Sequence, residues 1–380
     1  MFTTIPITIL SFAGVLTVVT LVPSYYRAKN IPVLLSIFWL ASTGICIGIN
    51  TAGWQGNAAI KWKAYCEISI RFVYASAFAL QCCSVLLLSR LEAIAATRYV
   101  SLTESAKKRR FIIEVGIGFI LPILYIALAV VNQGHRYDVI EYFGPTMSIY
   151  PTVLSVILST APTLVASVIA VVYALLCAYW LFMRRRQLSA VLSSSGSGVN
   201  ISQYVRLFGL SCMELMWTVP INWTIQMQNL FNRYGDGDTL YPYPSWSIVH
   251  EGYSLINQFT IEELRSTPVG RRNLPILYLG SLSIAVSCFI FFAFLGTSRE
   301  ISNDIALKSS KLFKSFRIRS KAVRKQKQTS ASNSLSQPPL SPNEEMKMES
   351  MDDLKADDMH IEVIVERTLY EEPSTGKRAA

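Results

Sequence analysis

The feature that most constrains this chain is a series of seven long apolar runs, separated by more polar stretches. A helix needs about 20 apolar residues to cross the hydrocarbon core of a bilayer, and each run is long enough for one crossing. Because the bilayer core contains no water to pair with backbone groups, runs of this kind are expected to be α-helices. The expected spans are residues 5–26, 31–53, 66–94, 111–131, 152–182, 204–226 and 274–296.

The composition is that of a membrane protein. Hydrophobic residues make up 51% of the 380 residues and charged residues only 16%, whereas soluble domains contain about 25% charged residues. The net charge of +10 could indicate a nucleic-acid partner. However, the Lys and Arg residues cluster beside the apolar runs and near the C-terminus, where they indicate membrane orientation. No nucleic-acid partner is therefore expected.

The same basic residues predict the direction in which the chain crosses the membrane. With the N-terminus outside, the inner loops contain the basic clusters at 107–110 and 184–186, as the positive-inside rule favours. The sequence therefore predicts an all-α seven-transmembrane helix bundle over residues 1–300, followed by a cytosolic tail over 301–380. Within the tail, residues 308–327 are densely basic and either form an amphipathic helix on membrane lipids or stay solvated. The rest of the tail is expected to be disordered.

Charged groups inside apolar runs are the clearest hints of function. A charge near a helix centre costs roughly 2.5–3.5 kcal/mol on insertion scales, so such groups usually face a bundle interior or a wet cavity. Glu214 lies about a turn and a half before Pro220. The two residues could form a helix switch, and a static hydrogen bond between helices is an equal alternative for Glu214. A transporter or channel with a polar pathway through Glu67, Arg71 and Glu214 also fits this pattern.

Catalytic and metal-binding motifs are missing from the sequence. The three histidines, His135, His250 and His360, form no metal motif with the seven cysteines, and no C-x-x-C pair occurs. The sequence has no nucleophile elbow and no phosphate-binding loop. We therefore expect neither an enzyme nor a bound cofactor or metal.

Two predicted outer loops contain the sharpest local patterns. Residues 54–57 read Trp-Gln-Gly-Asn, and residues 133–138 read Gln-Gly-His-Arg-Tyr-Asp. Aromatic rings, hydrogen-bonding groups and Gly turns beside a membrane face could form the rim of a ligand pocket. The same residue types also form the aromatic belts that mark a membrane interface.

Several segments together resemble the fungal mating-pheromone receptors of the a-factor type, which are class D seven-helix G-protein-coupled receptors for farnesylated peptides. The resemblance covers roughly residues 1–305, and the segment Gln133 to Asp138 is its most specific part. The other matching segments are Asn50-Thr51 with Trp54, Gly56 and Asn57; Cys66-Glu67-Ile68 with Arg71; Arg90-Leu91-Glu92; Ala95 to Arg98; Lys107 to Arg110; and Phe291 to Gly296.

This resemblance implies a plasma-membrane receptor that binds a farnesylated peptide pheromone and activates a heterotrimeric G protein. The candidate ligand-binding residues are Trp54, Asn57, Glu67, His135, Arg136, Tyr137, Asp138, Trp246 and His250. The candidate residues for G-protein coupling are Arg90, Arg98, Arg109, Arg110, Arg184, Arg185, Arg186 and Arg206.

The chain departs from the family pattern at one position. Family members usually have a cysteine after a Gly in the second outer loop, where it is available to the cysteine of the third helix. Here Gly144 is followed by Pro145, and the loop contains no cysteine. Cys66 therefore lacks the expected partner. Either the loop is held in another way, or the chain is a diverged receptor-like protein without a mating role.

Overall fold

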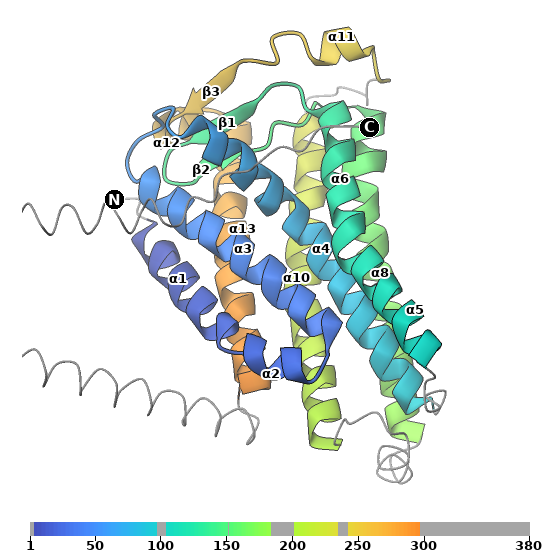
Figure 1. The fold of residues 1–380 in the computed structure, drawn as a ribbon. Helices are drawn as coiled ribbons and strands as arrows, with labels where there is room; N and C mark the ends of the chain where they lie inside the picture. Colours follow the sequence, from blue (N-terminus) through green and yellow to red (C-terminus); the bar gives the residue numbers. More distant parts are fainter. Residues whose placement is uncertain (1–3, 97–103, 151, 184–200, 235–241, 297–380) are drawn as a thin grey trace, which may run out of the picture. The chain divides into compact units, whose positions relative to one another are not determined.

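The computed structural model describes residues 4–96, 104–150, 152–183, 201–234 and 242–296, which form a bundle of long helices with a small β-sheet at one end (Figure 1). Within these residues, six helical segments are long and apolar enough to cross a membrane. They are Ile5–Arg27, Ile31–Gly53, Lys63–Ala95, Glu104–Asn132, Val153–Met183 and Pro268–Gly296. The prediction of a helical membrane bundle is confirmed.

Several of these segments consist of more than one helix. The first is made of α1 (Ile5–Val19) and α2 (Val22–Arg27), the second is α3 (Ile31–Gly53) and the third is α4 (Lys63–Ala95). The fourth is made of α5 (Glu104–Val115), the π-helix η1 (Gly116–Ile120), α6 (Leu121–Ala129) and the 3₁₀ turn η2 (Val130–Asn132). The fifth is made of α7 (Val153–Ser155), the π-helix η3 (Val156–Thr160) and α8 (Ala161–Met183). The last is α13 (Pro268–Gly296).

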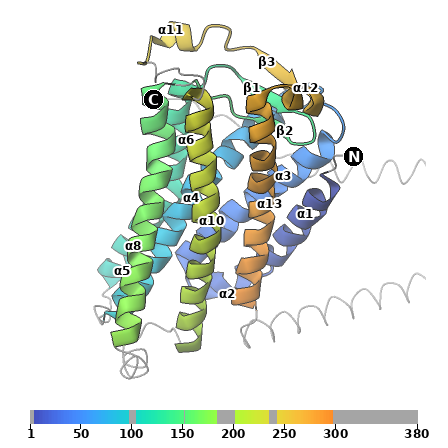
Figure 2. The same ribbon diagram turned by 180° about the vertical axis from the view of Figure 1, so that it is seen from behind.

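The region of the predicted sixth span forms α10 (Ile201–Tyr234), a helix of 34 residues that is not among the six. Polar side chains such as Glu214, Asn222 and Gln226 make it less apolar than the others. It nevertheless packs against α13, α4 and α8, and Figure 2 shows it running beside α13. A helix can be polar at these positions when it lies against other helices rather than against lipid.

The two π-helices stand directly before the internal prolines Pro122 and Pro162. Proline has no N–H and collides with the carbonyl four residues earlier, so an α-helix is disturbed one turn before it. The carbonyl of Gly118, four residues before Pro122, accepts a hydrogen bond of 2.9 Å from Trp39 Nε1 instead. The helix therefore makes a wider turn before Pro122, and the Gly118 carbonyl in this turn binds a neighbouring helix.

The structure also contains a small β-sheet, which was not predicted from the sequence. Strand β1 (Tyr137–Ile140) pairs antiparallel with β2 (Gly144–Thr146) and parallel with β3 (Ile256–Phe259), in the order β2-β1-β3. The short helices α11 (Trp246–Val249) and α12 (Ile261–Ser266) flank β3. We call β1, β2, β3, α11 and α12, with the loops joining them, the sheet cap. It joins two loops that are far apart in the sequence and covers one end of the bundle (Figures 1 and 2).

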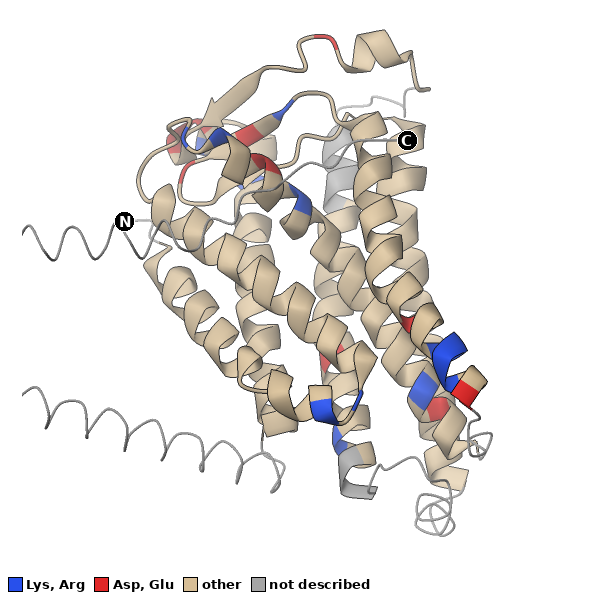
Figure 3. Cartoon of the chain, viewed as in Figure 1, with Lys and Arg blue, Asp and Glu red and all other residues tan. Residues whose placement is uncertain are grey.

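Charged residues concentrate at the two ends of the bundle, and the middle is largely uncharged (Figure 3). One end is the sheet cap. The opposite end, which we call the basic end, includes Lys107, Arg109 and Arg110 on α5 and Arg90 on α4. This separation of charge is what a helix bundle needs to sit in a bilayer.

Candidate ligand cavity and the groups around it

A cavity of about 480 Å³ lies in the bundle directly beneath the sheet cap. Its walls are formed by α3, α4, α6, α7, η3, α10 and α13, and residues of the cap and the chain next to it form the rest of its described lining. Phe143, Pro145 and Met147 come from the β1–β2 hairpin and the chain after it. Gly144 allows this close approach: with φ +77°, it lies where a Cβ atom would meet Asn50 Cβ at 3.0 Å. The hairpin therefore packs tightly against α3.

None of the described residues that line the cavity is charged. Aliphatic side chains such as Ile221 and Leu277 alternate with hydroxyl and amide groups such as Asn222, Gln226 and Asn273. Ligand sites are typically mostly apolar with a few well-placed polar groups. A chamber of this kind suits a neutral, amphipathic molecule, because a buried charge would find no partner of opposite sign there.

Two stacked tyrosines form part of the wall. The rings of Tyr74 on α4 and Tyr125 on α6 are parallel within 9°, with centroids 5.0 Å apart. The Tyr125 hydroxyl donates a hydrogen bond of 2.8 Å to the carbonyl of Ser159 in η3. This contact ties the π-helical turn to α6, so the shape of the wall depends on a turn that is not regular α-helix.

Glu214 is 6% exposed and contacts residues of the cavity wall. Its Oε2 accepts a hydrogen bond of 3.2 Å from the hydroxyl of Ser287, a cavity-lining residue of α13. One turn later on α10, the hydroxyl of Thr218 donates to the Glu214 carbonyl at 2.8 Å and accepts from Gln81 Nε2 of α4 at 3.2 Å. We call these four residues the polar latch. It joins α4, α10 and α13 through neutral hydrogen-bonding groups and one carboxyl group.

Charged and polar side chains bind the sheet cap to α4. Arg136 forms an ion pair with Glu67 near the start of α4, and its Nε donates to Glu67 Oε1 at 2.5 Å. The hydrogen bond to Glu67 raises the pKa of Arg136 above its usual value. Next to it, His135 Nε2 lies 2.6 Å from Asp138 Oδ1 and His135 Nδ1 lies 3.1 Å from the Ser148 hydroxyl. These contacts fix the loop to α4 and to itself.

The thiol of Cys66 has a role other than the expected disulfide. Cys66 is fully buried as a free cysteine, and its Sγ lies 3.2 Å from the carbonyl of Lys61. It packs in one cluster with Trp54, Ile70 and Tyr137 of β1. Burial raises the pKa of the Tyr137 hydroxyl to about 12, so the ring stays neutral in this cluster. The second loop is thus held by packing, strand pairing and the Arg136 ion pair.

The remaining candidate ligand residues lie in the loops around the cap. Trp54 is fully buried and donates to the Ala59 carbonyl at 2.8 Å, while Asn57 bonds to Gln55 within its own turn. Trp246 of α11 is 56% exposed and stacks on His250, with ring centroids 3.8 Å apart. None of the nine candidate ligand residues lines the cavity. Their role in ligand binding stays a prediction.

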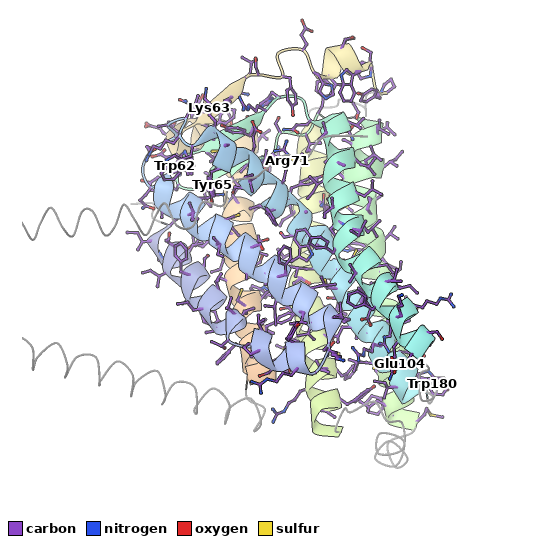
Figure 4. The ribbon with its side chains drawn as sticks, viewed as in Figure 1. Trp62, Lys63, Tyr65, Arg71, Glu104 and Trp180 are labelled. Carbon is purple, nitrogen blue, oxygen red and sulfur yellow. The ribbon has the colours of Figure 1, made fainter. Side chains whose placement is uncertain are left out.

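The basic end contains a second set of contacts between helices. Figure 4 shows Trp180 of α8 there, at the opposite end from Trp62 and Tyr65. The Trp180 indole donates to Glu92 at 3.1 Å, and the Tyr204 hydroxyl of α10 lies 3.4 Å from the Leu91 carbonyl of α4. These two contacts hold α8 and α10 against the end of α4.

The predicted coupling residues occupy different surroundings at this end. Arg90 donates to Asn30 Oδ1 at 3.2 Å, Arg110 pairs with Glu114 at 2.8 Å, and Arg109 is exposed. Arg206 Nη1 is buried and has no hydrogen-bond partner among the described residues. Arg98 and the cluster Arg184, Arg185 and Arg186 lie outside the described residues.

The cavity walls were not predicted from the sequence, although the sequence contains a usable signal for them. Tyr74, Asn222 and Gln226 are polar residues within apolar stretches, and each lines the cavity. Amides and hydroxyls in a membrane helix face other helices or a cavity more readily than lipid. The sequence does not indicate which helices bring these groups together, because that depends on the three-dimensional packing of the bundle.

Comparison with known proteins gives the family. Residues 6–307 match the family model STE3, described as "Pheromone A receptor". The chain belongs to this family of fungal pheromone receptors. It is 33% identical to "Pheromone receptor 1" of Ustilago hordei over 276 residues, which is 73% of this chain and 75% of that protein. It is also 33% identical to "Pheromone receptor 1" of Mycosarcoma maydis, with the same coverage of both chains.

A more distant relative is the "Pheromone a factor receptor" of Saccharomyces cerevisiae. The chain is 24% identical to it over 221 residues, which cover 57% of this chain and 47% of the yeast protein. The predicted family resemblance is confirmed by these matches. The chain therefore belongs to a family of receptors, and this membership argues against an enzymatic function.

Proposed function

We propose that this chain is a plasma-membrane G-protein-coupled receptor that binds a farnesylated peptide pheromone in fungal mating. The sheet cap faces the cell exterior and the basic end faces the cytosol, as the positive-inside rule requires. The observation that carries the proposal is an uncharged cavity of about 480 Å³ beneath a cap bound by charged groups. Family membership supports the same function.

The chemistry of the two regions matches the two parts of a lipopeptide. An apolar prenyl chain gains free energy when it leaves water, at about 25 cal/mol per Å² of buried apolar surface. Side chains such as Ile221, Ile225 and Leu277 offer such a surface in the cavity. The polar part of the peptide then lies against the sheet cap and its loops, where Arg136, Asp138 and the other candidate ligand residues are found.

Activation requires two arrangements of the bundle that the ligand and the G protein distinguish. The polar latch joins α10 to both α4 and α13 next to the cavity, so a ligand there can change its hydrogen bonds. We propose that a shift of α10 opens a cleft at the basic end. Residues such as Arg90, Arg109 and Arg206 then contact the G protein.

Expression in a fungal reporter strain that lacks its own receptor tests this function. A panel of farnesylated peptides should include at least one that gives a dose-dependent response, and the same peptide without the farnesyl group should be much weaker. Silence across a broad panel, with surface expression confirmed, would contradict the proposal. Ion or solute flux through liposomes that contain only the purified protein would instead favour a transporter.

A further inference from the structure

The hydroxyl groups of the membrane helices divide into two kinds. Most donate to a carbonyl of their own helix, as Ser36 does to Pro32 at 3.0 Å and Ser42 does to Phe38 at 2.8 Å. This habit satisfies the hydroxyl without any other group. Thr43, the neighbour of Ser42 on α3, is fully buried, and its Oγ1 has no hydrogen-bond partner among the described residues.

Ser159 in η3 repeats this behaviour on a different wall. Its side chain is 7% exposed in the bundle, and its Oγ has no partner among the described residues. By contrast, Ser155 and Ser167 in the same transmembrane segment donate to carbonyls at 2.8 Å and 2.7 Å. The Ser159 carbonyl accepts a hydrogen bond from Tyr125, so among the described contacts the carbonyl of Ser159 is paired and its hydroxyl is not.

Thr43 and Ser159 share one further property, which is that both line the cavity. A buried hydroxyl without a partner costs roughly 1–3 kcal/mol, so the presence of two such groups in the cavity wall calls for a structural or functional explanation. Both oxygens are too deeply buried for a water molecule to reach them in this arrangement, so a small shift of the cavity wall is needed to bring them to a ligand. A ligand that comes within reach must supply acceptors of its own, because an unpaired buried hydroxyl remains costly.

We propose that Thr43 Oγ1 and Ser159 Oγ donate hydrogen bonds to neutral carbonyl groups of the bound lipopeptide and so fix its position in the cavity. The acceptors are amide or ester carbonyls rather than carboxylates, because none of the described lining residues carries a positive charge. The inference rests on the proposed function, since it takes the ligand to be a lipid-modified peptide. It adds two residues and a ligand chemistry that the sequence motifs do not indicate.

Two near-isosteric substitutions test the proposal, Thr43→Val and Ser159→Ala. Each removes a hydroxyl that no described side chain or backbone group uses, so receptor stability should stay the same or rise slightly. Potency of the active farnesylated peptide should fall about three- to tenfold for each variant, the value of one neutral hydrogen bond. Loss of potency without loss of stability separates a ligand contact from a structural role.

The matched control is Ser283→Ala. Ser283 also lines the cavity, but its hydroxyl already donates to the Gly280 carbonyl at 2.7 Å. This variant should keep its potency within about twofold of the wild type, since its hydroxyl offers no free donor to the ligand. Reporter dose-response curves, binding of a labelled farnesylated peptide and the Tm of the purified full chain give the three readouts.

The outcomes separate the two levels of the proposal. A wild-type receptor that ignores the whole peptide panel overturns the proposed function, and the inference falls with it. A responsive wild type whose potency is unchanged in both Thr43→Val and Ser159→Ala overturns the inference alone. Equal losses in Ser283→Ala, or a lowered Tm that accounts for the lost potency, also overturn it.

Discussion

The sheet cap and the cavity beneath it are neighbours with opposite chemistry. The cap is fastened by an ion pair between Arg136 and Glu67, and by His135 beside Asp138. The cavity has no charged group among its described lining residues, although hydroxyls and amides occur on several of its walls. Charge is tolerated at the cap because solvent and partners are close, whereas a lone charge within the membrane is costly.

The difference between the cap and the cavity separates two roles, holding the cap in place and binding the ligand. The segment from Gln133 to Asp138 is the most recognisable part of the sequence, and its side chains largely bind the cap to α4 and to itself. The space for a ligand lies below it, and most of its lining residues stand outside the matching segments, with Asn50 as an exception. The most specific motif therefore supports the site, and residues that lie mostly outside the motifs form its walls.

Filling the cavity should have the largest effect on pheromone potency. Ala77→Phe places a ring on an α4 residue that lines the cavity, and it should lower pheromone potency by at least about 100-fold, equivalent to about 2.8 kcal/mol. Val172→Phe on α8 is the control, because Val172 is 48% exposed on the surface of the bundle. Reporter dose-response curves measure both variants. Equal potency of Ala77→Phe and wild type would show that the ligand binds elsewhere.

The polar latch should control basal signalling rather than affinity. Glu214→Leu removes the acceptor for Ser287, and the loss of about 1 kcal/mol from the ligand-free arrangement should raise basal activity about fivefold. Glu214→Gln keeps an oxygen acceptor and should stay near wild type, which makes it the matched control. Unchanged basal activity in Glu214→Leu, at equal surface expression, would leave Glu214 as a static hydrogen-bonding group.

The ion pair of the cap should contribute modestly to the thermal stability of the receptor. Glu67→Ala, Arg136→Ala and the double variant should each lower the Tm by on the order of 2 °C, because both side chains are one-third exposed. The double variant should be no worse than the single ones, and high salt should shrink the effect. Additive losses in this double-mutant cycle would show that the two side chains act independently.

The same pair gives a prediction for pH. Pairing raises the pKa of Arg136, so its stabilising charge is fully present below the unfolded value and is lost only as pH rises through the higher folded value. Both values lie far above neutral pH. The Arg136 charge should therefore cause no change in Tm between about pH 7 and pH 9. A fall in the Tm difference between wild type and Arg136→Ala over this interval would contradict the assignment.

The smallest effect is expected at the far side of the cap. Trp246 stacks on His250, and His250 Nε2 lies 3.0 Å from the Val130 carbonyl, so this pair is anchored away from the cavity walls. Trp246→Ala should change pheromone potency by less than about threefold, since a half-exposed side chain at a rim contributes little. A tenfold loss measured in the reporter strain would place the ligand over α11 instead.

Much of the bundle could be predicted from the sequence, because long apolar runs leave only helices as solutions in lipid. The polar latch was partly foreseeable, since a carboxyl group at Glu214 needs a partner within the bundle. Its partners could not be foreseen, because Ser287 and Gln81 are ordinary polar residues on helices far apart in the sequence. Helix packing alone brings them to one depth.

The β-sheet could not be predicted from local sequence patterns. Strand β3 comes from the loop after α10, and its parallel pairing with β1 joins Tyr137 to Ile256 across more than a hundred residues. Strands of three or four residues leave almost no alternation to detect. The missing loop cysteine was visible in the sequence, but the arrangement that holds the loop without a disulfide was not.

Photo-crosslinking of an active farnesylated peptide tests the central claim most directly. A photoreactive group in the prenyl chain should label the cavity-lining stretches of α10 and α13, including the peptides that contain Ile221 and Leu277. Unlabelled peptide should compete, and Ala77→Phe should abolish the labelling. Labelling confined to the exposed surface of α8 around Val172, or to the sheet cap, would contradict binding of the lipid chain in the uncharged cavity.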